Sequence, residues 1–176
     1  MGFAAIRPVI PALFLLACGE GGPSGAATAT RPDATPHPAE RAVRAELERY
    51  YDDFSRRDWP AFAEHFWPEA TIATVWQPPG EPAARVDVQT VPDFVAKAPL
   101  GPGSKPIFEE RLTGVDIRVI GNLAQAWARY HARFGDSGAV AEWDGIDGFT
   151  LLALDGRWRI VSLAFTDADG EVTDRR

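Results

Sequence analysis

Cysteine, histidine and basic charge are all scarce in this chain of 176 residues. A single Cys excludes an intramolecular disulfide and a cysteine-rich metal site, and three scattered His lead us to expect no metal. Lys and Arg number 18 against 25 Asp and Glu, which gives a net charge of −7 and a pI near 4.9. Because no basic surplus is present to neutralise phosphates, we expect no nucleic-acid partner.

Long apolar runs are also missing. The longest near the amino terminus, Val9–Ala17, follows the single charge of Arg7 and is too short to cross a hydrocarbon core of about 30 Å. Residues 1–17 are therefore predicted to be a signal peptide. The sequence Leu15-Leu16-Ala17-Cys18 resembles the lipobox of bacterial lipoproteins. This resemblance implies cleavage after Ala17, a lipid on Cys18 and a periplasm-facing position in the bacterial envelope; the alternative is a secretory signal whose cleavage site happens to end in Cys.

The segment from Cys18 to Pro38 is rich in Gly, Pro, Ala, Ser and Thr and has no Ile, Leu, Val or aromatic residue. Such a composition buries nothing, so we expect a flexible tether that contains His37. We expect one folded domain over 39–170, followed by a charged tail over 171–176.

Two helices are predicted at the start of this domain. Apolar side chains recur at helical spacing within 39–56, at Val43, Leu47, Tyr50, Tyr51 and Phe54. Asp58 is a candidate N-cap for a second, short helix that ends at Pro68. His65 lies beside the apolar stripe of that helix, where we expect a solvated flank.

The remaining chain has mostly the alternating pattern of strands. Strands are predicted over 71–76, 85–90, 107–120, 123–134, 142–154 and 157–166, with a short helix over 92–98. The pairs Gly121-Asn122 and Asp155-Gly156 suit positive φ in tight hairpins. An antiparallel meander preceded by helices predicts an α+β domain.

Alternation separates two faces of this sheet. The buried face is predicted to hold Tyr130 and Asp147, together with Trp158, Ile160, Ser162 and Ala164 on the last strand. The opposite face is predicted to be polar, with Arg129, His131 and Arg133 on one strand and interruptions at Trp127, Leu152, Leu163 and Phe165.

Several short motifs resemble the NTF2-like superfamily, in particular SnoaL-like and DUF4440-type proteins and bacterial members labelled "putative lumazine-binding". They are Tyr50-Tyr51-Asp52, Arg57-Asp58-Trp59, Phe66-Trp67-Pro68-Glu69-Ala70, Gly121-Asn122-Leu123-Ala124, Gly145-Ile146-Asp147-Gly148-Phe149 and Gly156-Arg157-Trp158-Arg159-Ile160. The resemblance implies a cone of two or three helices on a strongly curved antiparallel sheet. It implies no particular chemistry, because the superfamily contains both enzymes and binding modules.

That resemblance also implies a pocket inside the cone. We expect its walls to be formed by Tyr50, Trp59, Phe66, Phe94, Tyr130, Trp143, Asp147, Phe149 and Trp158. Burial among such walls would raise the pKa of Asp147 and suit it to act as a general base or a neutral donor. The other interpretation is that Asp147 only accepts hydrogen bonds and orders the pocket. Gly101–Lys105 lacks the spacing of a phosphate-binding loop, and we expect no cofactor.

Three functions compete at this point. The first is an envelope-anchored module without chemistry, which binds a small apolar or aromatic ligand or another envelope protein. The second is an isomerase, dehydratase or hydrolase, in the manner of ketosteroid isomerase, that uses Asp147 with Tyr130. The third is a structural homodimer joined through the outer face of the sheet. The first is preferred, because no second catalytic group is evident beside Asp147.

Overall fold

A computed structural model describes residues 37–77 and 80–167 of the chain. The predicted signal peptide over 1–17, Cys18, most of the tether and the tail over 171–176 lie outside the described residues. Within the described residues, no helix has both the length and the apolar character needed to cross a membrane.

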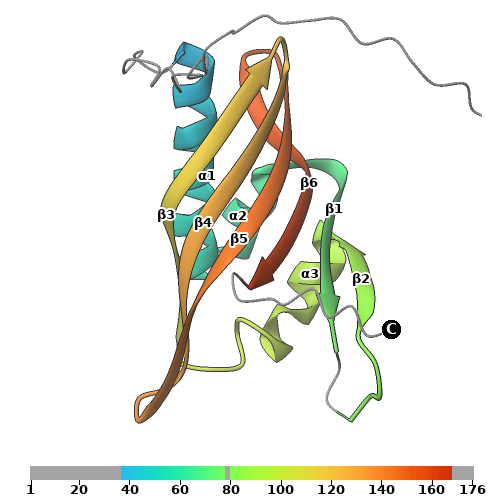
Figure 1. Ribbon diagram of the computed structural model, residues 1–176, viewed down its shortest axis with the longest axis vertical. Coiled ribbons are helices and arrows are strands. Elements are labelled where there is room, and N and C mark those ends of the chain that lie inside the picture. Colours follow the sequence, from blue (N-terminus) through green and yellow to red (C-terminus); the bar gives the residue numbers. More distant parts are fainter. Residues whose placement is uncertain (1–36, 78–79, 168–176) are drawn as a thin grey trace, which may run out of the picture. The chain divides into compact units, whose positions relative to one another are not determined.

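One six-stranded sheet and three short or medium helices form the domain (Figure 1). The helices are α1 (Pro38–Arg56), α2 (Trp59–Glu64) and α3 (Val91–Lys97), and the 3-10 turn η1 (Ala98–Leu100) follows α3. The strands are β1 (Phe66–Trp76), β2 (Arg85–Thr90), β3 (Ile107–Ile120), β4 (Leu123–Asp136), β5 (Ala139–Leu154) and β6 (Arg157–Asp167). Their order is β2-β1-β6-β5-β4-β3. The α+β class and the curved sheet expected from the sequence are confirmed.

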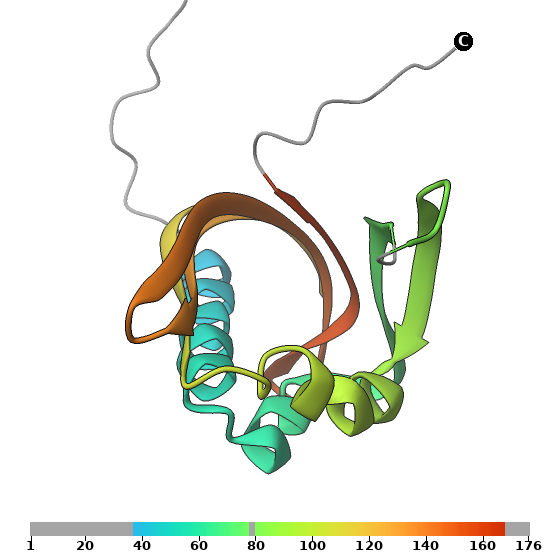
Figure 2. The same ribbon diagram turned by 90° about the horizontal axis from the view of Figure 1, so that it is seen from below.

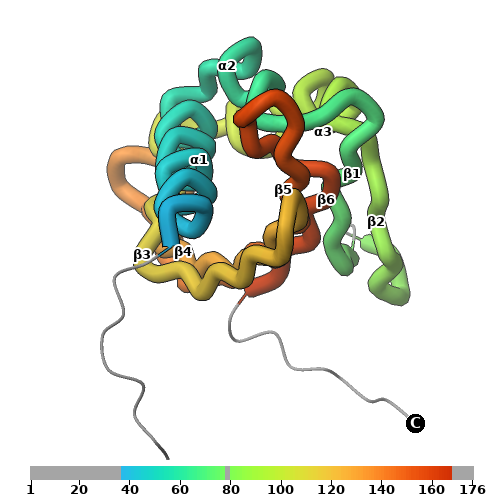
Figure 3. Tube along the Cα trace, turned by 90° about the horizontal axis from the view of Figure 1, so that it is seen from above, coloured from blue at the N-terminus to red at the C-terminus, as the bar shows by residue number. Residues whose placement is uncertain are grey.

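The sheet curls around α1, which lies on its concave side (Figure 2). Every neighbouring pair of strands is antiparallel except β1 and β6, which run parallel. Seen along the other direction, α1 and α2 complete the ring that β3 to β6 begin (Figure 3). The concave face of the sheet and the apolar stripe of α1 therefore share one core.

Helix α1 forms where the periodicity predicts it. Its buried side chains are the expected stripe of Val43, Leu47, Tyr50, Tyr51 and Phe54. His37 lies in the predicted tether but caps the helix, since its ring accepts a hydrogen bond from the backbone of Ala39 while Glu40 accepts one from the backbone of His37. Arg57 ends the helix with a left-handed φ of 58°.

Helix α2 begins as predicted and ends earlier. Asp58 is its N-cap and accepts a hydrogen bond from the backbone of Ala61 at 3.2 Å. The helix stops at Glu64, so its predicted extension to Pro68 is wrong. The chain enters β1 at Phe66 instead, because Phe66 pairs in parallel with Ile160 of β6.

His65, between α2 and β1, is only 6% exposed, so the predicted solvated flank is wrong. Its two ring nitrogens lie 2.8 Å from Glu46 and 2.9 Å from Asp53, both on α1. Two acidic side chains seven positions apart lie on one helix face and bury the ring between them.

The strands of the meander lie close to their predicted bounds. Strand β3 has the predicted bounds, whereas β4, β5 and β6 extend one to three residues further at one end. Gly121, Asp155 and Gly156 have positive φ in the two hairpin turns as expected, but Asn122 does not. All fourteen residues of β4 pair with β5 without a shift, which places Ala128 opposite Asp147 and Tyr130 opposite Gly145.

Two register shifts change which side chains face the core. The first lies in β3, between Leu112 and Gly114. The second lies in β6, between Ile160 and Ser162, which pair with Leu151 and Thr150 of β5. Beyond the second shift, Leu163 pairs with the buried Phe149 and is itself 4% exposed, while Ala164 is exposed. The predicted buried face was therefore wrong for Ser162, Ala164, Leu163 and Phe165, because an extra residue reverses the alternation.

Candidate functional site

A small cavity lies in the interior of the curved sheet, with a volume of about 40 Å³. Its walls come from α1, α3 and five of the six strands, and its only two carboxyl side chains come from β3 and β5. The lining residues are Tyr50, Phe54, Ile72, Phe94, Glu110, Tyr130, Asp147, Leu163 and Phe165. The site is thus an apolar and aromatic enclosure around two acids.

Asp147 occupies the middle of β5 and faces inward with 3% of its surface exposed. Its Oδ2 accepts a hydrogen bond from the hydroxyl of Tyr51 at 2.5 Å. Burial raises the pKa of Asp147 to about 7, and the Tyr51 hydrogen bond opposes that rise. The carboxyl group therefore changes protonation state near neutral pH. The upward direction of the pKa shift is the one expected from the sequence.

Glu110 is a second acid of the site that the sequence analysis missed. It is half-buried, and its backbone is held to α1 because Ser55 Oγ accepts from its N–H at 2.9 Å and donates to its carbonyl at 2.7 Å. Burial raises the pKa of Glu110, and the charges of Asp147 and Asp167 raise it further. Two acids in one apolar cavity disfavour each other's ionisation, so the site readily holds a proton.

Tyr130 reaches the cavity across a glycine. A Cβ at Gly145 would lie 2.1 Å from Cζ and 2.2 Å from the hydroxyl of Tyr130, so only glycine leaves room for the ring there. Burial raises the pKa of Tyr130, as do the charges of Glu110 and Asp147, while a hydrogen bond with Trp143 opposes the rise. Tyr130 thus stays a neutral hydroxyl at the edge of the acid pair.

The structure brings together four of the nine residues predicted for the pocket. Tyr50, Phe94, Tyr130 and Asp147 line the cavity. Phe149 is buried in the adjoining core, and Trp143 is partly buried against that core.

The other three lie elsewhere. Trp59 and Phe66 line a surface groove of about 670 Å³ beside α2 and α3, and Phe66 also contributes to the core. Trp158 lines a separate pocket of about 400 Å³ between α1, α2 and the turn into β6. Apolar periodicity identified these three as inward side chains but could not assign them to one enclosure.

A larger groove adjoins the cavity. It has a volume of about 980 Å³ and lies between the β1–β2 hairpin, the α3–η1 segment and the end of β6. Phe94 and Phe165 line both spaces. Leu100 and Trp76 of the groove are 87% and 49% exposed. A ligand could therefore place one polar end at the acids and its larger part along an apolar groove.

Within residues 37–77 and 80–167, no group of three or more His, Cys, Asp or Glu side chains converges in the arrangement of a metal site. The two acids of the cavity, the Tyr51 hydroxyl that bonds Asp147 and the Tyr130 hydroxyl of the same cavity can donate and accept hydrogen bonds. They can also transfer a proton near neutral pH.

The chain matches one known protein family over most of its length. A model of the family described as "Putative lumazine-binding" matches residues 38–166. No curated protein matches the chain.

Solved structures with the same fold share little sequence with it. One described as a "Putative Scytalone Dehydratase", from Novosphingobium aromaticivorans, has 14% identity and a TM-score of 0.59 over 73% of this chain and 83% of its own. An NTF-2 like protein of unknown function from Silicibacter pomeroyi has 19% identity and a TM-score of 0.53 over 73% and 95%. A putative dehydratase of the NTF2-like family from Streptomyces avermitilis has 14% identity and a TM-score of 0.58 over 73% and 95%. At this identity they show the NTF2-like fold alone.

Proposed function

This chain belongs to the family described as "Putative lumazine-binding", and from that premise we propose that it is a binding module for a small aromatic or apolar ligand. The observation that carries the proposal is the placement of the two carboxyls of Asp147 and Glu110 in a cavity whose other walls are mainly apolar and aromatic. Such a site binds by burying apolar surface and selects by a few polar groups.

The two connected spaces suggest the form of the ligand. A cavity of about 40 Å³ admits only a polar group of a few atoms, whereas the adjoining groove of about 980 Å³ admits a ring system. Phe94 and Phe165 stand at the junction, where they can stack against a planar ring. We therefore expect a planar heterocycle whose polar edge reaches Asp147.

Asp147 and Glu110 favour a ligand whose polar edge both donates and accepts hydrogen bonds. A protonated carboxyl donates one hydrogen bond and accepts others, and an ionised one only accepts. Because the pKa of Asp147 lies at about 7 and that of Glu110 is raised, the pair can present one proton and several acceptor sites together. An amide-like ring edge, such as that of a pteridine, complements this arrangement.

The proposal is tested by thermal-shift screening of the full chain against lumazine and other aromatic heterocycles, with steroids and fatty acids as further probes. A ligand of the site should raise Tm for the wild type and for Asp144→Asn, which changes an exposed acid on the outer face of β5. The shift should be lost or much reduced in Asp147→Asn. No shift with any probe, or an equal shift in Asp147→Asn, would refute ligand binding at this cavity.

A second candidate is an isomerase, dehydratase or hydrolase that uses Asp147 with Tyr130. It is favoured by the pKa of Asp147 at about 7, since a general base works best when its pKa is near the operating pH. Asp147 would take a proton from the substrate, and the neutral Tyr130 hydroxyl would donate to the oxygen where charge develops. Turnover abolished in Asp147→Asn and reduced in Tyr130→Phe, with both variants folded, would support it. If Asp147→Asn unfolds the domain, the residue is structural and this candidate fails.

A structural homodimer is a third candidate, favoured by exposed apolar side chains on the outer face of the sheet. Trp127 is 63% exposed, and Leu123 and Leu152 are 38% and 37% exposed on the same face. Burying such a patch against a second copy would stabilise a dimer. Sedimentation of the delipidated chain should then give twice the monomer mass, and Trp127→Glu should restore the monomer. A monomeric wild type contradicts this candidate.

We further propose that the protein is anchored in the bacterial envelope through a lipid on Cys18, which supports a periplasm-facing role. The support is the sequence Leu15-Leu16-Ala17-Cys18 and the fact that the chain has no other thiol. Growth with labelled palmitate should label the wild type but not Cys18→Ala, and the variant should leave the membrane fraction. A mature wild-type protein without an acyl chain would refute the anchor.

A further inference from the structure

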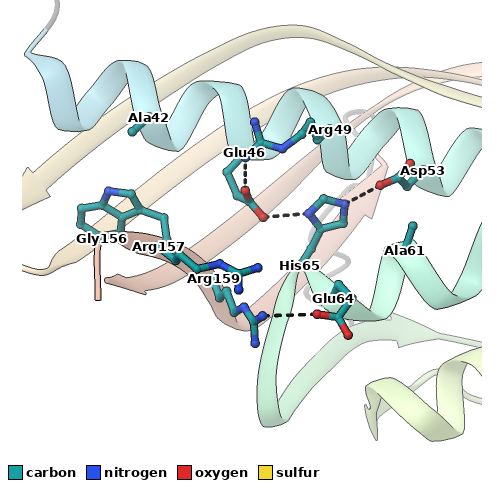
Figure 4. A pocket seen from close by; sticks show the side chains of 11 residues that line it. Ala42, Glu46, Arg49, Asp53, Ala61, Glu64, His65, Gly156, Arg157 and Arg159 are labelled. Atoms are coloured by element: carbon teal, nitrogen blue, oxygen red, sulfur yellow. Dashed lines mark hydrogen bonds and ion pairs between the residues drawn. The ribbon is translucent and has the colours of Figure 1, made fainter. Parts of the chain in front are cut away.

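A second pocket, drawn in Figure 4, lies against another face of α1 and shares no lining residue with the Asp147 cavity. Its volume is about 400 Å³, within the usual range for small-ligand sites. The walls are one face of α1, the end of α2 and the start of β6. The charged residues among them are Glu46, Arg49, Asp53, Glu64, His65, Arg157 and Arg159.

The three acids of this pocket are already engaged by neighbouring cations. Glu46 binds Arg49 and the Nδ1 of His65, and Asp53 binds Arg56 and the Nε2 of His65. Burial alone would lower the pKa of His65, but the hydrogen bonds to Glu46 and Asp53 raise it overall. Because both ring nitrogens face carboxylates, the ring carries a proton on each and is cationic.

Glu64, the third acid, binds Arg159 at 3.3 Å, and the guanidinium of Arg159 also lies over the ring of Trp67, 5.2 Å from its centroid. The Nε of Arg159 is buried and has no hydrogen-bond partner within the described residues. A buried donor without an acceptor is costly, so a ligand oxygen that reaches this atom would stabilise the site.

Among the cations that line this pocket, Arg157 is the one that no residue of the described chain neutralises. It makes no ion pair or hydrogen bond with any residue of the described ranges, although it lines the pocket. Figure 4 shows its side chain extending from β6 toward Glu46 and His65, beside that of Arg159. Two neighbouring guanidinium groups with one carboxylate partner, Glu64, leave room for an anion.

The charge balance of the walls defines that anion. Arg49, Arg157, Arg159 and His65 supply four positive charges, and Glu46, Asp53 and Glu64 supply three negative ones. A single added negative charge completes the balance. Beside Arg157, Trp158 offers an aromatic surface, and Ala42 and Ala61 offer small apolar ones.

We propose that this pocket binds a small organic monoanion, in which a carboxylate engages Arg157 and Arg159 and an apolar or aromatic body packs against Trp158. The planar fork of an arginine matches a carboxylate with two parallel hydrogen bonds. This site is independent of the Asp147 cavity and of any ligand bound there.

The test is calorimetric titration of the full chain, in detergent where it is lipidated, with benzoate and with inorganic phosphate as separate probes. Benzoate should bind saturably and more tightly than phosphate. Arg157→Gln should weaken benzoate binding roughly tenfold, the effect of losing one charge-assisted hydrogen-bonded pair. The matched control is Arg118→Gln, which removes the same charge from an exposed position on β3 that lies outside the pocket, and it should leave binding unchanged.

A third variant is expected to strengthen benzoate binding, so the test includes a gain of affinity as well as a loss. Glu64→Gln frees Arg159 from its carboxylate partner, so benzoate should bind more tightly, by roughly threefold. Asp147→Asn should have no effect, which separates this site from the proposed interior one. The proposal is overturned if benzoate does not bind, if phosphate binds more tightly than benzoate, if Arg157→Gln and Arg118→Gln behave alike, or if Glu64→Gln weakens binding.

Discussion

The hydroxyl of Tyr51 lies 2.5 Å from Oδ2 of Asp147, although 96 positions separate the two residues in the chain. This contact joins α1 to the middle of β5, and both side chains are almost completely buried. Tyr51 favours the ionised form of the carboxyl, whereas burial favours the neutral form. The opposition of these two effects sets the titration of Asp147 near neutral pH.

Removing the Tyr51 hydroxyl should shift that titration upward. In Tyr51→Phe the carboxylate loses its hydrogen-bond donor while the burial remains, so the pKa of Asp147 should rise above 7. The measurement is the pH dependence of the carboxyl carbon shift of Asp147 by NMR. Tyr50→Phe removes a neighbouring hydroxyl that does not bond Asp147 and should leave its pKa unchanged. An unchanged or lower pKa in Tyr51→Phe would contradict the opposing roles assigned to the two effects.

The burial of Asp147 should make the protein less stable as pH rises. Its pKa is about 7 in the folded state and near 3.8 when unfolded, so between these values the folded chain holds a proton that the unfolded chain has released. The free energy of unfolding should therefore fall by roughly 2–4 kcal/mol between pH 4 and pH 8 because of this group. Asp147→Asn lacks the titration, so its stability should depend less on pH and exceed that of the wild type at pH 8.

Urea denaturation at pH 4, 6 and 8 measures this difference. The matched control is Asp144→Asn, an exposed acid three positions earlier on the outer face of β5, which should follow the wild-type pH dependence. Glu110 also has a raised pKa and adds a slope of the same sign. Because the charge of Asp147 contributes to that rise, the difference between wild type and variant includes the titration of Asp147 and its effect on Glu110. A variant that parallels the wild type at all three pH values would disprove the assignment.

Gly145 should be essential for the position of Tyr130. Gly145→Ala places a methyl group 2.1 Å from Cζ of that ring, so the ring must move and the domain should lose about 1–3 kcal/mol of stability. Gly148→Ala is the control in the same strand, because its Cβ would meet Trp127 no closer than 3.5 Å, an ordinary contact. Urea denaturation compares the two. Equal free energies of unfolding for Gly145→Ala and Gly148→Ala would mean that the Tyr130 ring can adopt another position without cost.

The regular strands explain why alternation placed Asp147 and Tyr130 correctly on the inner face. Strands β4 and β5 pair along their length without a shift, so an inward side chain at one position fixes the direction of every second one. The hairpin turns and most strand bounds followed from Gly, Asn and Asp at the turns. Local patterns were therefore sufficient where the backbone is regular.

Glu110 was missed because the backbone there is irregular. In a regular strand, alternation from the inward-facing Val115 predicts that Glu110 faces outward. The register shift between Leu112 and Gly114 adds one residue to β3, which reverses the alternation, so Glu110 faces inward. No residue type in that stretch predicts a β-bulge. Tyr51 was recognised as a core residue of α1, but its bond to Asp147 depends on how the helix lies against the sheet, which periodicity does not specify.

His65 should stabilise the domain as a cation clamped between two acids. His65→Gln leaves Glu46 and Asp53 without that charge, and should cost roughly 2–4 kcal/mol at pH 6, below the range for a fully buried pair because the two acids keep 13% and 16% exposure. Since the folded-state pKa of His65 is raised above 6.5, its contribution is fully present below pH 6.5 and is lost as pH rises through the higher folded value.

Urea denaturation of wild type and His65→Gln at pH 6 and pH 9 tests this, and the gap in stability should narrow at pH 9. The control is His131→Gln, because His131 bonds Asp144 on the exposed outer face and should contribute less than about 1 kcal/mol at either pH. A gap that widens at pH 9 would mean that the buried ring acts as a neutral group. In that case the walls of the neighbouring pocket would lose one positive charge, and the charge balance that favours a bound monoanion there would fail with it.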